Sequence, residues 1–154
     1  MAQVLARSAS VVSGLTTCRR KIAMTLADFN NHYSYKYDPK GRDQWRVLKP
    51  NALDQYHGDC EDYSLSVLYY VICRESWFRF WWLLITFQAE ICGCNTKNGG
   101  HAVLRYGDMY IDNWTKTWVE REDMQELGHE FWPWYLTILP TTVAIKMVMA
   151  KLRG

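Results

Sequence analysis

The sequence predicts an α+β domain, in which a buried helix packs on a small antiparallel sheet. Three observations predict this class. An apolar run after Asp59 predicts a helix over about residues 60–73. The strand-like segments "HAVLRY" and "MYIDNW" are joined by Gly107-Asp108, a pair typical of a two-residue hairpin loop. Pro140, at a favoured first helical position, opens a final helix through "TTVAIKMVMAKL".

The remaining elements follow from turn and strand signals between these anchors. Residues 24–57 are expected as a polar, aromatic-rich lead-in, with turns at "YDPKGRD" and "KPNALD". The segment "FQAEICGC" suits a strand, and "NTKNGG" suits a loop. A charged loop is expected to reach Gly128.

Composition bounds the class of protein. The chain has 154 residues, of which 49% are hydrophobic and 15% aromatic, enough for one domain with a real core and too apolar for a disordered chain. A formal net charge of +2 favours neither a strongly basic nor a strongly acidic partner, so no nucleic acid is expected. Five cysteines without a regular framework favour a reducing compartment, and we therefore expect a cytoplasmic protein.

The first residues differ from the rest of the chain. Residues 1–27 contain four basic residues and no acid, and Asp28 is the first carboxylate. We interpret residues 1–23 as a basic, flexible arm and residues 24–154 as the single domain. Acid-poor, Arg- and Ser-rich segments also resemble organelle transit peptides, so transit or export of this segment stays open.

A long apolar stretch, residues 67–87, raises the question of a membrane span. Arg74, Glu75 and Arg79 lie inside it, and charges at the centre of a span are costly. We therefore expect two elements: a helix ending near Cys73, and a second apolar segment, Trp77 to Thr86, that belongs to the core. A lipid or peptide groove on that segment is the alternative, and a membrane partner is not expected.

The stretch "GDCEDYSLSVLYYV" places one cysteine among three acids at the start of the predicted helix. Asp59 suits the N-cap, and Asp62, three residues on, suits a capping box. Acids in the first turn also complement the helix dipole. Capping explains the acids but not Cys60, whose thiol would have its pKa lowered at a helix N-terminus, a recurring setting for nucleophilic cysteines.

A histidine with an orienting carboxylate follows from the predicted hairpin. With Gly107-Asp108 as its loop, Tyr106 pairs with Met109, and the register places Asp112 diagonal to His101 on the same face. Asn113 points to the other face. Register alone therefore nominates Asp112, not Asn113, to orient the imidazole of His101. A thiolate, an imidazole and a carboxylate divide the labour of acyl chemistry among nucleophile, base and orienting group.

At these residues the chain resembles a known family. "GDCEDYSLSVLYYV" and "GHAVLRYGDMYIDNW", in this order, resemble the bacterial transglutaminase-like cysteine proteinases, a branch of the papain-like superfamily. The resemblance covers roughly residues 45–115. It implies a papain-like or transglutaminase-like core, with Cys60 as nucleophile, His101 as base and Asp112 as third member. The implied activity is thiol-dependent hydrolysis of a peptide or amide bond, with a peptide or protein as substrate and no required cofactor.

The resemblance leaves alternatives open. Transglutaminases and arylamine acetyltransferases share the Cys, His, Asp order, so acyl transfer through the same thioester is one alternative, and a catalytically silent structural or inhibitory binding module is another. A bacterium or its virus is the implied source; for a viral protein, host cytoplasm or virion becomes the expected location. Oligomeric state is not predicted.

Three accessory sites are also considered. Some family members bind calcium beside the nucleophile, and Asp59, Glu61 and Asp62 match those positions, although helix capping explains the same acids equally well. Gln55 or Tyr56 would supplement the backbone N–H of Cys60 in an oxyanion hole. A zinc site of cysteines 60, 73, 92 or 94 with His101 is a further alternative, and its spacing matches no common zinc module.

Overall fold

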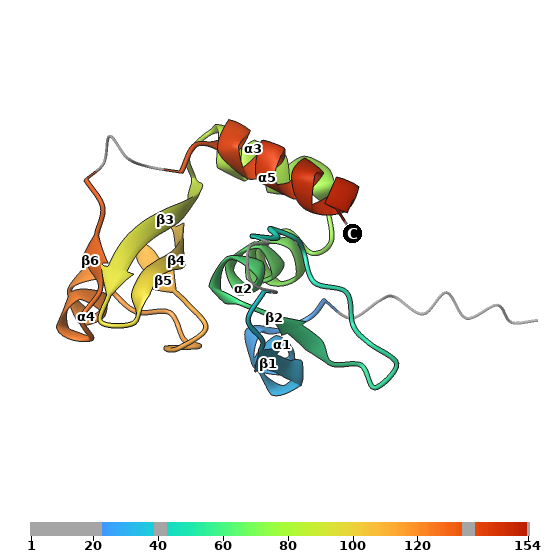
Figure 1. Cartoon of the computed structure of the whole chain (residues 1–154), viewed down its shortest axis with the longest axis horizontal. Coiled ribbons are helices and arrows are strands. Elements are labelled where there is room, and N and C mark those ends of the chain that lie inside the picture. The colour runs from blue at the N-terminus through green and yellow to red at the C-terminus, as the bar shows by residue number, and fades with distance from the viewer. Residues whose placement is uncertain (1–22, 39–42, 134–137, 154) are drawn as a thin grey trace, which may run out of the picture.

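The computed structural model describes residues 23–38, 43–133 and 138–153 of the chain (Figure 1). The basic arm expected at residues 1–23 lies almost entirely outside this range. The described chain is mixed α+β, as predicted, with a curled antiparallel sheet. Its helices are α1 (Leu26–His32), α2 (Cys60–Ser66), the π-helix η1 (Val67–Ile72), α3 (Trp77–Ile85), α4 (Arg121–Glu126) and α5 (Pro140–Arg153). Its strands are β1 (Tyr33–Tyr35), β2 (Tyr56–Gly58), β3 (Ala89–Thr96), β4 (Gly99–Tyr106), β5 (Met109–Ile111) and β6 (Glu130–Phe131).

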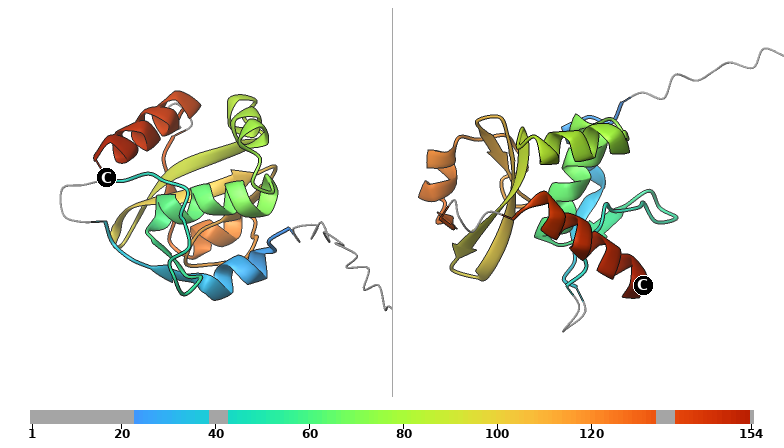
Figure 2. Two further views of the ribbon diagram at one scale, coloured as in Figure 1. Left: turned by 90° about the vertical axis from the view of Figure 1, so that its right-hand side faces the viewer. Right: turned by 90° about the horizontal axis from the view of Figure 1, so that it is seen from above.

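The main sheet has the strand order β5-β4-β3-β6, with every pair antiparallel. Helix α4 lies on one side of this sheet, whereas α2, α3 and α5 lie on the other (Figure 2). A second, two-stranded sheet pairs β1 with β2 in parallel. Strand β2 leads directly into α2, so it fixes where that helix begins.

The predicted hairpin register is confirmed. Tyr106 pairs with Met109 across a loop whose Gly107 has a φ of 61°, a left-handed conformation that glycine adopts without strain. The second strand is shorter than expected, because it ends at Ile111 rather than at Trp114. The carboxylate of Asp112 accepts the backbone N–H groups of Trp114 and Thr115, and this local turn draws the chain away from the ladder.

The predicted helix over residues 60–73 is present as α2 continued by η1. Asp59 is the N-cap, and its side chain accepts the backbone N–H of Asp62 at a long 3.5 Å. The expected capping box is wrong, because the Asp62 carboxylate binds Arg46 instead of returning to the N-cap. The π-helical hydrogen bonding of η1 was not predicted, since the apolar pattern does not distinguish helices that differ by one residue in hydrogen-bond span.

Several short elements were missed. The lead-in contains α1 with a Thr25–Asp28 capping box, and the charged loop before Gly128 contains α4, with Glu120 and Asp123 as its capping box. Strands β1, β2 and β6 have three residues or fewer, too short for an alternating pattern to show.

The apolar segment 77–86 is only partly core. In α3, Phe80, Leu83 and Leu84 are buried, whereas Phe78 is 79% exposed and Trp82 54% exposed. The expectation that the whole segment packs inside is therefore wrong; the helix buries one stripe and exposes the other. Among the helices in the described ranges, none is long and apolar enough to cross a membrane.

Candidate active site

Asp112 and His101 meet at the edge of the main sheet. His101 Nε2 lies 2.7 Å from Asp112 Oδ2, and both side chains are buried. Strand β4 carries His101 two residues after its start, while Asp112 follows directly on the end of β5. The contact is the one that the hairpin register predicted. Asn113 is buried too, but its Oδ1 has no hydrogen-bond partner among the described residues.

The Asp112 carboxylate is held by donors on both oxygens. Oδ1 accepts from the backbone N–H of Trp114 at 3.1 Å, the backbone N–H of Thr115 at 2.7 Å and the Thr115 hydroxyl at 2.9 Å. Burial by itself would raise the pKa of Asp112, but hydrogen bonds from His101 and Thr115 outweigh burial and lower that pKa to about 2. Asp112 is therefore an ionised carboxylate in a fixed orientation.

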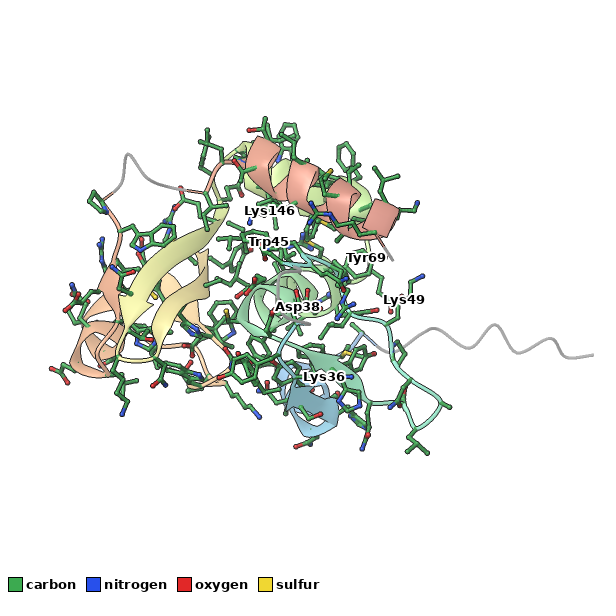
Figure 3. The ribbon with its side chains drawn as sticks, viewed as in Figure 1. Lys36, Asp38, Trp45, Lys49, Tyr69 and Lys146 are labelled. Atoms are coloured by element: carbon green, nitrogen blue, oxygen red, sulfur yellow. The ribbon has the colours of Figure 1, made fainter. Side chains whose placement is uncertain are left out.

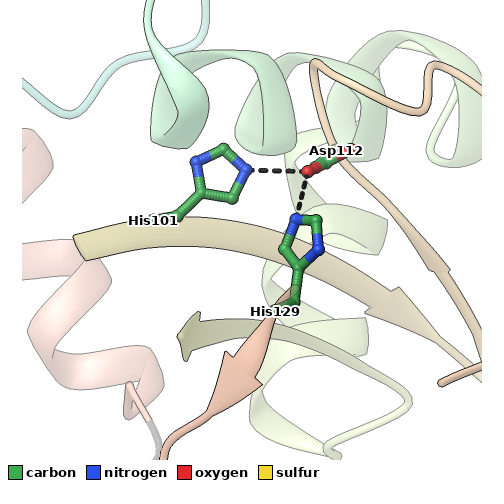
Figure 4. Close-up of side chains that lie close together, drawn as sticks. All are labelled: His101, Asp112 and His129. Atoms are coloured by element: carbon green, nitrogen blue, oxygen red, sulfur yellow. Dashed lines mark hydrogen bonds and ion pairs between the residues drawn. The ribbon is translucent and has the colours of Figure 1, made fainter. Parts of the chain in front are cut away.

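Sequence reasoning missed a second histidine in this cluster. Nε2 of His129 lies 2.9 Å from the same Asp112 Oδ2, so two imidazoles converge on one oxygen (Figure 4). The other nitrogen of His129, Nδ1, donates to the backbone carbonyl of Met124 at 2.9 Å. His129 follows α4 and precedes β6, two elements that were not predicted. A lone histidine just after the expected loop carried no signal that would have placed it here.

An aromatic ring covers the pair. The indole of Trp114 stacks on the His101 ring with centroids 4.4 Å apart and planes 23° from parallel. Its ring also lies 5.3 Å from that of His129. Stacking restricts rotation of the imidazole and shields its hydrogen bond to Asp112 from water.

Cys60 is the first residue of α2, as predicted. Its thiol donates to Glu61 Oε2 at 2.8 Å. Burial, followed by the charge and hydrogen bond of Glu61, raises the pKa of Cys60, whereas the backbone N–H of Ala102 acts in the opposite direction. Ala102 is the neighbour of His101 in β4, so the sulfur lies close to this part of the strand. No hydrogen bond joins Cys60 to His101 among the described residues, and the thiol is protonated at neutral pH.

The acids around Cys60 form a cluster whose negative charges are only partly balanced by nearby cations. Burial and the neighbouring carboxylates raise the pKa of Asp59 to about 8. Burial raises the pKa of Glu61, with a contribution from Asp43, and raises that of Asp62 to about 7, despite its contact with Arg46. This field opposes thiolate formation at Cys60.

Two cations reach the cluster from other segments. Arg46 donates its backbone N–H to Asp62 Oδ1 at 2.9 Å and its Nε to Asp62 Oδ2 at 3.1 Å. Lys146 of α5 pairs with Asp43 and lies 5.0 Å from the centre of the Trp45 ring. Figure 3 labels Lys146 and Trp45, which lie between α5 and α2 in that view. Arg46 thus binds both oxygens of Asp62, and calcium binding by Asp59, Glu61 and Asp62 stays a prediction.

The two residues suggested for the oxyanion hole, Gln55 and Tyr56, differ in burial. Tyr56 is buried in β2, and its ring packs 5.1 Å from Phe29 and 5.5 Å from Tyr70 in an aromatic cluster. Gln55 is exposed, and its backbone N–H donates to Asn51 Oδ1 in a turn. Their contribution to an oxyanion hole stays a prediction.

The described cysteines do not gather into a metal site. Cysteines 60, 73, 92 and 94 are free thiols. Among the described residues, the group of histidine, cysteine and acidic side chains that could hold a metal consists of His101, Asp112 and His129, and it includes no cysteine. Cys94 instead donates to the carbonyl of His101 at 3.6 Å. A search with the chain against protein-family models, curated proteins and solved structures gives no match.

Proposed function

We propose that the chain is a thiol-dependent hydrolase of a peptide or amide bond, with a papain-like or transglutaminase-like core. Cys60 is the nucleophile, His101 the base and Asp112 the group that orients the imidazole. The observation that carries this proposal is the 2.7 Å contact between His101 Nε2 and Asp112 Oδ2. It requires a proton on Nε2, so a neutral imidazole presents the lone pair of Nδ1 to accept a proton.

The chemistry starts from a neutral thiol. His101 Nδ1 takes the Cys60 proton as the sulfur attacks the substrate carbonyl, and the resulting imidazolium is stabilised by Asp112. The imidazolium returns the proton to the leaving amine, and a thioester remains on Cys60. Water, deprotonated by His101, then releases the acid. An amine in place of water gives acyl transfer through the same thioester.

A second candidate function is a catalytically silent binding module. The observation that favours it is the thiol itself, which donates to Glu61 and has a raised pKa. In this alternative the His101–Asp112 contact stabilises the hairpin and does not serve catalysis.

A peptide-library digestion tests the proposal. Wild-type protein and the variants Cys60→Ala and His101→Ala are incubated with the library, and new termini are identified by mass spectrometry. We expect cleavage by the wild type only. Added primary amine separates the two enzymatic outcomes, because acyl transfer gives an amide product of higher mass. Cleavage that survives Cys60→Ala contradicts the proposal, and an uncleaved library together with equal alkylation rates at Cys60 and the buried Cys73 favours the silent module.

A further inference from the structure

We propose that His101, Asp112 and His129 form a binding site for one divalent metal ion of the zinc class. The three candidate ligand atoms are the Nε2 atoms of the two histidines and Oδ2 of the carboxylate, and all lie within 4.8 Å of one another. Two imidazole nitrogens and one carboxylate oxygen are a donor set that zinc and its first-row neighbours take, with a fourth position for water.

The ligand atoms need to move little to admit a metal. Each histidine Nε2 is within 2.9 Å of Asp112 Oδ2. In a tetrahedral zinc site with metal–ligand distances of about 2.0–2.1 Å, ligand atoms are about 3.3 Å apart. Each nitrogen–oxygen separation must therefore lengthen by roughly half an ångström, and the two Nε2 atoms, which lie within 4.8 Å of each other, must adopt a similar spacing.

The hydrogen-bond partners of His129 and Asp112 favour a cation between these two side chains. The Met124 carbonyl can only accept, so Nδ1 of His129 carries a proton. The second nitrogen faces an ionised carboxylate that is already a fourfold acceptor, including the hydrogen bond from His101. Nε2 of His129 lies against that carboxylate at a position with no exposed side-chain surface, where a cation could accept a lone pair from each. With a metal, both histidines are neutral, and their Nε2 lone pairs are the ligands.

Hydrogen bonds to neighbouring groups hold two of the candidate ligands in the way that is common in metal sites. A ligating histidine commonly donates its other N–H to a backbone carbonyl, as His129 does to Met124. Ligating carboxylates are commonly held by further donors, as Asp112 Oδ1 is by Thr115. A pocket of about 580 Å³ lies beside the cluster and is lined in part by Trp114, Thr115 and His129.

Metal binding would regulate the proposed hydrolase, and this consequence rests on the proposed function. With Nε2 of His101 on the metal, the proton of a neutral imidazole moves to Nδ1, the nitrogen that would accept the Cys60 proton. His101 is then no longer a base. Zinc should therefore inhibit hydrolysis reversibly, and a chelator should restore it.

Binding is tested without any substrate. Chelator-treated, dialysed wild-type protein is titrated with Zn²⁺ by calorimetry, and we expect one ion per chain. His129→Gln should weaken binding by about 100-fold or more, since one of three protein ligands is lost. Cys60→Ala and His32→Gln are the matched controls and should bind as the wild type does; His32 is an exposed histidine on α1.

Cobalt provides a measurement on the wild type that does not depend on a variant's folding. Co²⁺ should give visible bands of a four-coordinate nitrogen and oxygen site without a sulfur-to-cobalt charge-transfer band. In the zinc complex, the NMR signals of His101 and His129 should shift, while those of His32 and His57 stay in place. A charge-transfer band that Cys60→Ala removes, or affinity unchanged in a folded His129→Gln variant, overturns the site.

The two proposals fail separately. One equivalent of zinc bound as described, without loss of hydrolysis, supports the metal site and contradicts the role of His101 as base. No zinc binding to the wild type beyond that of His129→Gln contradicts the metal site and leaves the hydrolase proposal to its own test.

Discussion

Asp112 and Asp59 are two buried carboxylates near the proposed thiol chemistry, and they differ in their partners. Asp112 receives hydrogen bonds on both oxygens from two histidines and one turn, and its pKa falls to about 2. Asp59 has a single long hydrogen bond, and burial together with three acidic neighbours, Glu61, Asp62 and Asp38, raises its pKa to about 8. Similar burial thus gives opposite charge states, because donors stabilise a carboxylate and like charges destabilise it.

Cys60 therefore lies between an ionised, well-bonded carboxylate on the sheet side and a group of acids on the helix side. On the sheet side, an ionised Asp112 holds the imidazole of His101. On the helix side, the Cys60 thiol donates a hydrogen bond to Glu61, and burial together with this carboxylate raises the pKa of the thiol. A helix N-terminus was expected to activate the thiol, but burial and the adjacent acid reverse that expectation. In the proposed hydrolase, nucleophilic attack by Cys60 therefore depends on proton removal by His101 during attack, rather than on a thiolate formed beforehand.

The largest effect on hydrolysis is expected from removing the carboxylate of Asp112. Asp112→Ala should lower hydrolysis by roughly 10²–10⁴-fold, because His101 loses its orientation and the imidazolium loses its counter-charge. Asn113→Ala is the control, and it should retain most activity and change stability only. Rates are measured on a peptide cleaved by the wild type, with circular dichroism to verify folding. Asp112→Asn, which keeps an acceptor for Thr115, replaces the alanine variant if that variant does not fold. Equal losses at positions 112 and 113 would show that the hairpin contact has no catalytic role.

The second effect concerns the acid beside the thiol. Glu61→Gln removes a charge and a carboxylate acceptor, so the pKa of Cys60 should fall. Each unit of that fall raises the thiolate fraction tenfold at a fixed pH below the pKa. We therefore expect alkylation of Cys60 at pH 8 to be about tenfold faster or more in the variant than in the wild type. Labelling is followed by mass spectrometry, with Cys73 as internal control. A rate equal to that of the wild type would mean that burial alone suppresses the thiol.

A third effect is a pH dependence of stability. The pKa of Asp59 is raised on folding, so the folded state holds a proton that the unfolded chain loses near pH 4. Its contribution to stability is present below about pH 4 and is lost as pH rises towards 8. Asp59→Asn, which keeps an N-cap acceptor, should therefore raise the melting temperature at pH 8 and flatten its decline between pH 5 and 8. The exposed Asp108→Asn in the hairpin loop is the control. A decline that persists in full in Asp59→Asn would assign it to Asp62 and Glu61.

The smallest effect is expected from calcium. Because Arg46 binds both oxygens of Asp62, calcium should leave the melting temperature and the alkylation rate of Cys60 unchanged at pH 8. Arg46→Gln frees that carboxylate and should make both signals respond, since a bound cation stabilises the folded state and lowers the thiol's pKa. A response in the wild type would show that Arg46 yields its place to the ion.

The sequence by itself determined the features that depend on neighbours along the chain. The helix start at Cys60, its Asp59 cap and the start of α5 at Pro140 follow from local preferences. A two-residue loop and the alternation of faces were sufficient to select Asp112 over Asn113 as the partner of His101.

Only the tertiary structure decided the charge states and the third member of the Asp112 cluster. His129 reaches Asp112 across 17 residues through two short elements without a periodic pattern. Arg46 takes Asp62 away from the capping box across 16 residues, and Asp43 comes to lie beside Glu61. A residue's sequence neighbours fix its backbone conformation, but the pKa of a buried group depends on which donors and charges folding brings around it, and those come from distant segments of the chain.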